Sequence, residues 1–377
     1  MILTNKWEKG AIITVQNLVA YNNRFWVQQY NRIAVHCPIV AVIYDEEEIS
    51  LPLSIAMYQQ SLEDVLIFLF FGIGAKVIIL FVIRSPRPKV PPGRTILWMG
   101  LGIYWTLSAP IQMWPTMALA TSSALVTHPL LQTFAPFWGR HPIGDTLWSI
   151  IIQIVLGIVL LTERENPAGR ITLILSAVFS FGLWAVGENW GALTHSSASL
   201  VMGSPGAGLL AFIASLGLLT PVSWWSDNKV PRIISILLMI LWGLGTIWQA
   251  VHFNSLASWQ NVWIPQIDKA QPSWLNGLRA MEQHLITRHL IAANMTLSIL
   301  MAGTEWLFTR RQAGMLFWII FVITLLVLWS LGQGWGFRPA YGANLNAAPL
   351  FLLLVWSTSD HWKTTKSPPR AVSRLSA

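Results

Sequence analysis

Long apolar segments recur along this chain from residue 62 onward, separated by short links that hold turn residues and charges. A helix that crosses a bilayer needs about 20 consecutive apolar residues, so each segment is a candidate membrane span. The predicted spans cover residues 62–83, 95–113, 144–162, 171–189, 205–222, 232–252, 290–309, 314–333 and 346–362. Only 11% of the residues are charged, whereas a soluble domain has about 25%. The sequence therefore predicts an all-α, polytopic transmembrane protein with about nine helices.

The lysines and arginines fall mainly in alternate links, and this pattern predicts an orientation. Fourteen lie in the links of one side together with the C-terminal tail, and five lie in the links of the other side when the N-terminal tail is left out. Because basic residues favour the cytoplasmic side, the C-terminus is predicted to be cytoplasmic, in a bacterial plasma membrane. Nine spans then place the N-terminal tail outside, and the alternative is an even count with residues 33–57 partly in the membrane. The same placement explains the net charge of +8 without nucleic-acid binding.

A nine-residue motif occurs twice, at an offset of 145 residues. It reads LWAVGENWG at 183–191 and LWSLGQGWG at 328–336, with five identical positions. Flanking residues agree at similar offsets, since Pro205 matches Pro349 and Trp105 matches Trp248. A repeated pattern of this kind predicts two tandem four-helix repeats of parallel topology. The predicted division is an extramembrane tail at 1–60, a leading helix with a basic loop at 61–94, repeats at 95–222 and 232–362, and a basic cytoplasmic tail at 363–377.

The motif W-x-x-G-[EQ]-x-x-G, preceded by a His-Pro helix start and followed by a Pro-Leu-Leu helix, resembles a group of poorly characterised bacterial polytopic membrane proteins with a tandem four-helix repeat. The four-helix unit is also loosely similar to DoxX-type membrane proteins, some of which are subunits of quinone-linked oxidoreductases. This resemblance implies a membrane subunit, and it supplies no catalytic residue.

The candidate ligand site is built from the motif residues at the outer face. Glu188 in the first copy becomes Gln333 in the second, and Trp190 and Trp335 occupy equivalent positions. A carboxylate at a membrane boundary is costly unless it is paired or hydrated. Together with His195, these residues predict an outer-face pocket for a hydrophobic ligand such as a quinone or lipid. The alternative is an interfacial anchor in which headgroup water hydrates Glu188.

The helix that follows each motif copy has a recognisable start. Ser204 is the predicted N-cap with Pro205 as the first helical residue, and Asn346 takes a similar part in the second copy. The partial positive charge of these two N-termini suits an anionic or carbonyl-bearing ligand. The alternative is two capped helices with no ligand.

Ionisable side chains elsewhere give two further predictions. Lys76 and Glu305 lie at similar depths in two predicted spans, and we expect them to form a structural ion pair. Histidines gather in the outer links, and with nearby methionines they provide ligand types that suit copper or haem. No tight metal-binding spacing occurs, so the metal candidates are the isolated residues His128, His141 and His289.

The sequence carries no Walker loop, no nucleophile elbow, no zinc-protease motif and no dinucleotide fingerprint. The predicted function is therefore a non-catalytic membrane accessory subunit or binding protein with an outer-face pocket for a quinone or lipid, within a membrane redox complex that contains partner membrane subunits. Two alternatives stay open at this point. One is a transporter for a metal ion or small solute, and the other is a haem- or copper-binding membrane subunit.

Overall fold

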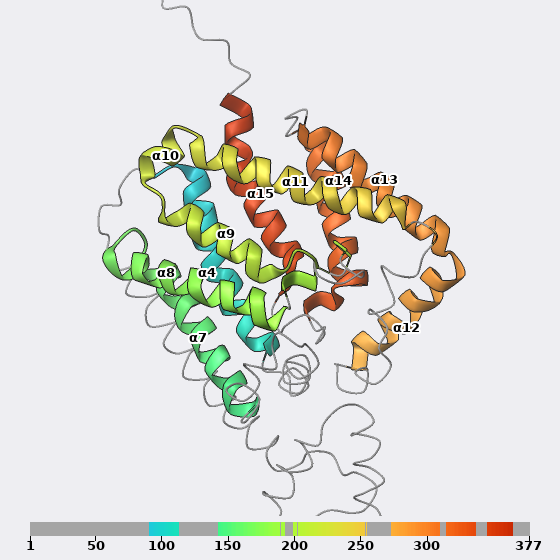
Figure 1. Cartoon of the computed structure of the whole chain (residues 1–377), viewed down its shortest axis with the longest axis horizontal. Helices are drawn as coiled ribbons and strands as arrows, with labels where there is room; N and C mark the ends of the chain where they lie inside the picture. The colour runs from blue at the N-terminus through green and yellow to red at the C-terminus, as the bar shows by residue number, and fades with distance from the viewer. Residues whose placement is uncertain are drawn as a thin grey trace, which may run out of the picture.

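The computed structural model describes residues 90–112, 142–188, 190–192, 199–201, 203–252, 254, 273–309, 314–336 and 345–364. Every regular element in these ranges is a helix, and they contain no strand (Figure 1). The all-α class is therefore confirmed for this part of the chain. The predicted tail at 1–60 and the predicted leading span at 62–83 lie outside the described residues.

The first described helices form one packed group. Helix α4 (Pro92–Gln112) packs against α7 (Pro142–Thr162), which continues through a short turn into α8 (Pro167–Gly182). Helix α8 packs against α9 (Ala207–Leu219), and the short α10 (Val222–Ser226) leads out of the group. We call these helices the first unit. Each predicted span between 95 and 222 overlaps one of them.

A second group follows and has a similar arrangement. Helix α11 (Lys229–Val251) packs against α13 (Leu290–Thr309) and against α15 (Ala347–Thr364), while α14 (Met315–Val327) packs against both α13 and α15. We call these helices the second unit. It contains one helix that the sequence analysis placed in a link, α12 (Ser273–Arg288). Half of residues 273–288 are polar or charged, so the segment gives no signal in a search for apolar segments of span length.

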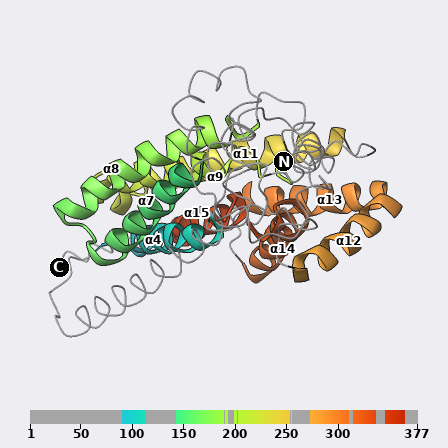
Figure 2. The ribbon, with the colours of Figure 1, turned by 90° about the horizontal axis from the view of Figure 1, so that it is seen from below.

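Helix α15 joins the two units, because it packs against α4 and α9 as well as against its own neighbours. Figure 2 shows α4 and α15 side by side. The close approach depends on small side chains, since a Cβ at Gly93 of α4 would overlap the carbonyl oxygen of Ser357 of α15. The last helix of the second unit is thus part of the core of the first.

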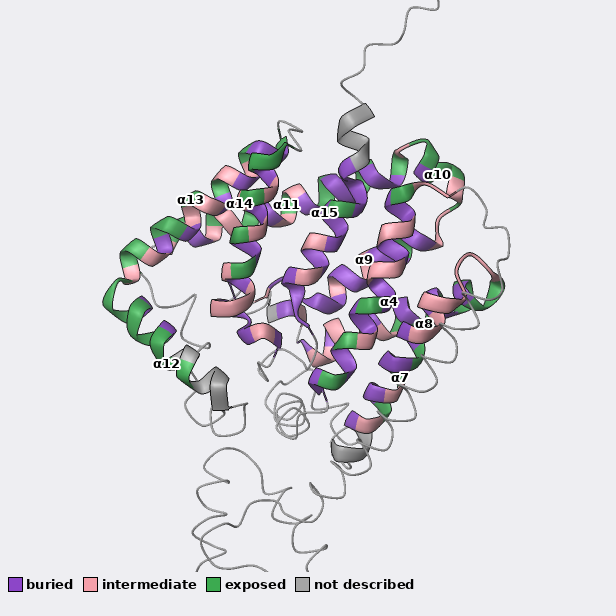
Figure 3. Cartoon of the chain, turned by 180° about the vertical axis from the view of Figure 1, so that it is seen from behind, coloured by how far each residue is buried: buried purple, intermediate pink, exposed green. Residues whose placement is uncertain are grey.

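Within the described residues, four helical segments are long and apolar enough to cross a membrane, by length and composition. These segments are Pro167–Gly187, Lys229–Val251, Leu290–Thr309 and Met315–Gly332. Their outer surfaces expose large apolar side chains, including Val178, Ile247 and Ile299, each with more than 60% of its surface free. Figure 3 shows that buried residues concentrate on α9 and α15, inside the group. Apolar side chains on the outside of a helix group suit contact with lipid, because the hydrocarbon core of a bilayer contains no water.

A buried arginine fixes the start of α4 to the far end of α9. Arg94 is 1% exposed, and its Nε donates to Glu165 Oε1 at 2.5 Å. The same guanidinium donates to the carbonyl oxygens of Leu218 at 2.7 Å and Thr220 at 2.9 Å. These carbonyls belong to the C-terminal end of α9, where the helix dipole favours a cation. Arg94 lies at the end of the basic loop predicted at 61–94, and no acidic partner was predicted for it.

Candidate functional site

The two motif copies have the same backbone conformation at the ends of α8 and α14. Each begins with a wide π-helical turn, η2 (Leu183–Gly187) or η7 (Leu328–Gly332). The backbone N–H of the next residue, Glu188 or Gln333, donates to the residue five positions earlier, at 2.7 and 3.0 Å. A short 3₁₀ turn follows, and Trp190 and Trp335 both adopt a positive φ of 57°. Single π-helical turns of this kind are often found at functional sites.

Glu188 and Gln333 each bind the first turn of the helix that follows. The Gly208 N–H of α9 donates to both carboxylate oxygens of Glu188, at 3.0 and 3.1 Å. The Ala348 N–H of α15 donates to Gln333 Oε1 at 3.1 Å. Both side chains are 2% exposed. These two side chains occupy the helix N-termini at which an anionic ligand was predicted. The helix dipole favours the negative charge of Glu188 at that position.

The predicted N-cap of α9 is therefore wrong. The helix begins at Ala207, and its N-cap is Gly206 with a φ of 104° and no side-chain hydrogen bond from that residue. Ser204 instead donates from its hydroxyl to the Gly191 carbonyl at 2.7 Å. The N–H of Gly206, which a cap at Ser204 would bind, donates to the Gly203 carbonyl at 2.8 Å, and Glu188 accepts the N–H of Gly208 in the first turn of the helix.

The predicted match of Pro205 with Pro349 is off by about one helical turn, as equivalent hydrogen bonds in the two copies show. The indole N–H of Trp184 donates to the Pro205 carbonyl at 2.7 Å, and that of Trp329 donates to the Leu345 carbonyl at 3.0 Å. Equivalent bonds therefore pair Pro205 with Leu345, an offset of 140 residues instead of 144. The loop that precedes the helix is shorter in the second copy.

The four motif tryptophans pack in pairs within their own copies. The ring centroids of Trp184 and Trp190 are 4.9 Å apart, and so are those of Trp329 and Trp335. Both pairs are edge-to-face, which is a favourable arrangement for aromatic rings. Trp190 and Trp335 were predicted to line the ligand pocket, and neither of them lines the pocket described next.

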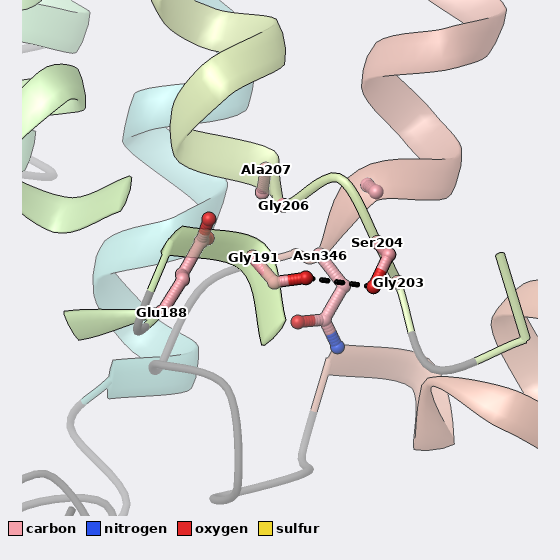
Figure 4. A pocket seen from close by; sticks show the side chains of 8 residues that line it. Glu188, Gly191, Gly203, Ser204, Gly206, Ala207 and Asn346 are labelled. Carbon is pink, nitrogen blue, oxygen red and sulfur yellow. Dashed lines mark hydrogen bonds between the residues drawn. The ribbon is translucent and has the colours of Figure 1, made fainter. Parts of the chain in front are cut away.

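A pocket lies where the two motif copies approach each other (Figure 4). The first unit lines it with Glu188, Ser204 and four small residues, and the start of α15 lines it with Asn346 and Ala347. The space among these residues amounts to about 220 Å³ when the part open to solvent is counted, and it has room for about one water molecule. Gln333 lies beside the pocket. Its Nε2 donates to the carbonyl of Leu200, in the loop before α9, at 3.3 Å. The inter-unit pocket, as we call it, thus contains one of the five predicted ligand residues and adjoins another.

Most of the remaining predicted site residues fall outside the part of the chain that the structure describes. His195, His128, His141 and Lys76 lie outside the described residues. His289 is exposed between α12 and α13, and the described part of the chain contains no group of three or more potential metal-ligating histidine, cysteine or carboxylate side chains. The predicted pair of Lys76 with Glu305 and the predicted metal site therefore stay predictions.

Sequence reasoning missed one pair of equivalent residues in the helices that support the site. Trp98 of α4 donates to the Leu160 carbonyl of α7 at 2.8 Å, and Trp242 of α11 donates to the Met301 carbonyl of α13 at 3.1 Å. The signal was present, since the chain reads WMGLGIYW from residue 98 and WGLGTIW from residue 242. One extra residue, Met99, breaks the match when the copies are compared at a fixed offset.

The substitution Gln333→Leu tests the helix cap in the second copy. It is expected to lower the free energy of unfolding by about 1–2 kcal/mol, because the buried N–H of Ala348 loses its acceptor. Gln333→Glu separates the two bonds of this side chain, because a carboxylate keeps the acceptor for Ala348 and loses the donor to the Leu200 carbonyl. Unfolding by SDS titration from a mild detergent measures both variants. An unchanged stability for Gln333→Leu would show that the bond contributes nothing.

Comparison with protein-family models, with curated proteins and with solved structures finds no match for this chain.

Proposed function

We propose that this chain is an integral membrane binding protein or accessory subunit of a bacterial plasma membrane, without catalytic activity of its own, and that it holds the polar head of a quinol or lipid in the inter-unit pocket. One observation carries the proposal. The carboxylate of Glu188, 2% exposed, lines a pocket to which both units contribute.

The proposed architecture is two tandem four-helix repeats after a leading span, with a cytoplasmic C-terminus and about nine spans in all. Three sets of equivalent hydrogen bonds support it. These sets are made by Glu188 and Gln333, by Trp184 and Trp329, and by Trp98 and Trp242. When both copies keep the hydrogen bonds that hold their structure, the side chains of one copy can change to bind a ligand.

The charge of Glu188 is the feature that needs a functional explanation. Gln333 makes the same helix cap with a neutral amide, so capping alone does not require a carboxylate. A buried charge costs more free energy than a buried amide, and an ionisable group inside a membrane protein is a functional candidate for that reason. We infer that the charge of Glu188 serves the ligand as well as the helix.

The chemistry of the pocket defines the part of the ligand that enters it. An ionised carboxylate only accepts hydrogen bonds, so the matching head carries a donor, such as a quinol hydroxyl or a hydroxyl or ammonium group of a lipid. The pocket has room beside the carboxylate for about one water molecule, far less than the about 300–1,000 Å³ of pockets for drug-sized ligands. A single donor group of the head therefore enters the pocket, and an apolar tail would lie along the exposed apolar side chains of the helices.

The test compares the ligands that copurify with the wild-type protein and with Glu188→Gln. Lipids and quinones are extracted from protein purified in mild detergent and quantified by mass spectrometry. The bound ligand is expected to fall about tenfold or more in Glu188→Gln, because a hydrogen bond to a charged group contributes about 1.5–3 kcal/mol.

Two controls make this result specific. Glu188→Gln is expected to remain folded, since Gln333 demonstrates that glutamine caps the equivalent helix. Asp227→Asn, which changes an exposed carboxylate outside the pocket, is expected to retain the ligand. Equal amounts of the same ligand in all three proteins would overturn the proposal.

A transporter for a small solute is the second candidate, and one observation favours it. Helix α9 has only 13 residues, which is about 20 Å of helix against a bilayer core of about 30 Å. It starts at the contact between the units, as the half-helices of transporters do at their substrate sites. Flux of a solute into liposomes that contain the purified protein, abolished by Glu188→Gln, would favour this function over the first.

A further inference from the structure

Three buried polar side chains lie around the first turn of α9, next to the inter-unit pocket. Glu188 accepts the Gly208 N–H of this turn, and a Cβ at Gly208 would lie 2.7 Å from the carbonyl oxygen of Ser180 in α8. Tyr104 of α4 is close enough to Glu188 for the charge of the carboxylate to act on its phenol. The exposed fractions of the three side chains are 2% for Glu188, 0% for Ser180 and 4% for Tyr104. The interior of the first unit is therefore polar at this level.

Two of these side chains end in a hydroxyl group that has no partner. Neither the Tyr104 hydroxyl nor Ser180 Oγ makes a hydrogen bond with any described residue, although both atoms are buried. The hydroxyl of Ser108, one turn further along α4, is a polar neighbour of the phenol, and it accepts the N–H of Leu345 at 3.3 Å. Leu345 directly precedes Asn346, which lines the inter-unit pocket. The face of α4 that carries Tyr104 thus reaches the start of α15 beside this pocket.

The second copy lacks the charge and both hydroxyl groups. The residues equivalent to Glu188, Ser180 and Tyr104 are Gln333, Leu325 and Ile247. The first two matches follow from the motif offset of 145 residues, and the third follows from the match of Trp105 with Trp248. Leu325 is buried, at 4% exposed, so a buried residue at this position of the helix does not have to be polar. The polar set is therefore confined to the copy that provides the carboxylate of the pocket.

The two side chains nearest the ligand differ in what they offer. An ionised carboxylate only accepts hydrogen bonds, whereas a tyrosine supplies one O–H donor. A buried donor without an acceptor is costly, so a head group that meets both side chains should donate to Glu188 and accept from Tyr104. A hydroxyl does both with one oxygen atom, in a pocket that has room for about one water molecule. An ammonium group accepts no hydrogen bond and would leave the phenol O–H unsatisfied.

We propose that Tyr104 is the second polar contact of the ligand bound beside Glu188, and that the ligand head is therefore a hydroxyl group. The inference rests on the proposed function and narrows it, because ammonium-headed lipids no longer fit. A quinol and a glycerol-headed lipid present the same hydroxyl chemistry, and the experiment distinguishes these two sources. Figure 4 shows α4 in cyan behind the Glu188 side chain, on the side from which the phenol would meet the head.

The experiment measures the binding of three probes to the full chain in mild detergent. The probes are tetramethylhydroquinone under anaerobic conditions, 1-O-hexylglycerol, and n-hexylammonium as the head that cannot accept a hydrogen bond. Equilibrium dialysis at constant ionic strength against protein-free micelles gives the saturable binding. The wild-type protein and Tyr104→Phe are compared with Thr324→Val, the matched control. Thr324→Val removes a buried hydroxyl of the second unit that donates within its own helix, to the Ile320 carbonyl at 2.7 Å.

At least one of the two hydroxyl probes is expected to bind the wild-type protein about tenfold more tightly than n-hexylammonium, which leaves a buried O–H unsatisfied. The tighter of the two identifies the source as a quinol or a glycerol lipid. Tyr104→Phe is expected to weaken its binding about three- to tenfold, as for the loss of one neutral hydrogen bond. Thr324→Val is expected to leave the binding unchanged.

A measurement of stability separates ligand contact from a structural role of Tyr104. SDS-induced unfolding of Tyr104→Phe without a probe is expected to match that of the wild-type protein, because the removed hydroxyl makes no hydrogen bond within the described structure. The comparison of the three probes on the wild-type protein does not depend on the folding of any variant. Weaker binding to a variant of unchanged stability would therefore report the lost contact.

Three results would each overturn the inference. They are no saturable binding of either hydroxyl probe, n-hexylammonium bound as tightly as the better hydroxyl probe, and an unchanged affinity of that probe for Tyr104→Phe. The proposed function has its own readout, the copurified ligand in Glu188→Gln. A ligand that is lost in Glu188→Gln and retained in Tyr104→Phe would leave the proposed function standing and remove only Tyr104 from the site.

Discussion

Arg94→Gln is expected to lower the free energy of unfolding by about 3–5 kcal/mol, which is the cost of breaking a buried ion pair by removing one partner. The guanidinium holds Glu165 through two hydrogen bonds, at 2.5 and 3.1 Å, and also binds two carbonyls at the end of α9. Its loss leaves the Glu165 side chain, 8% exposed, without its cation. The measurement is the midpoint and slope of SDS-induced unfolding from mild detergent.

Two controls separate this effect from a general effect of removing charge. Arg94→Gln combined with Glu165→Gln is expected to recover part of the lost stability, because no isolated carboxylate remains buried. Lys229→Gln removes the ion pair with Asp227, in which both side chains are more than half exposed, and exposed pairs contribute about 0–1 kcal/mol. Equal losses for Arg94→Gln and Lys229→Gln would show that the burial of Arg94 has no energetic consequence.

Gly332→Ala and Gly187→Ala are expected to have opposite effects, although they change the same position of the two motif copies. A Cβ at Gly332 would overlap the carbonyl oxygen of Val201 in the first unit, and that backbone atom cannot rotate away. Overpacking of this kind costs about 1–3 kcal/mol. At Gly187 the nearest atom to the new Cβ is Leu183 Cδ2 at 3.7 Å, an ordinary contact. Alanine there is expected to be neutral or to stabilise by up to about 1 kcal/mol, because glycine is unfavourable inside a helix.

The two variants are compared by thermal unfolding in the same detergent. Gly182→Ala is the control, because a Cβ at that position meets no atom within 4 Å. A destabilisation of Gly187→Ala as large as that of Gly332→Ala would contradict the structure at the contact between the units. The pair of substitutions thus tests whether the second motif copy packs closely against the first unit.

The positions of the helices were predicted well from the sequence. The predicted span at 290–309 coincides with α13, and every predicted span within the described residues overlaps a helix. The reason is that a run of apolar residues and its bounding turn residues are local signals. Helix α12 was missed because half of its residues are polar or charged and interrupt the apolar ones. Helix α4 was predicted as a span and is a helix, although it is not among the four long apolar segments.

The candidate site was predicted only in part. The repeated motif identified Glu188 and Gln333 as a pair, and the structure places them in equivalent bonds. The bonding partners, Gly208 and Ala348, could not be predicted, because the loop between motif and helix has a different length in each copy. Trp190 and Trp335 were expected in the pocket, but the turn at their positive φ directs them onto the first tryptophan of the motif.

The sequence by itself determined that this chain is helical and apolar, where its helices lie, and that one motif occurs twice. All of these are properties of segments shorter than about 25 residues, for which composition and periodicity suffice. Only the tertiary structure decided that Arg94 meets Glu165, 71 residues away, and that Gln333 meets Leu200, 133 residues away. It also decided that Glu188 lies at the contact between the units, because the packing of α15 onto α4 and α9 brings the two motif copies together. Contacts between distant segments depend on how helix surfaces fit, and no local pattern in the chain records that fit.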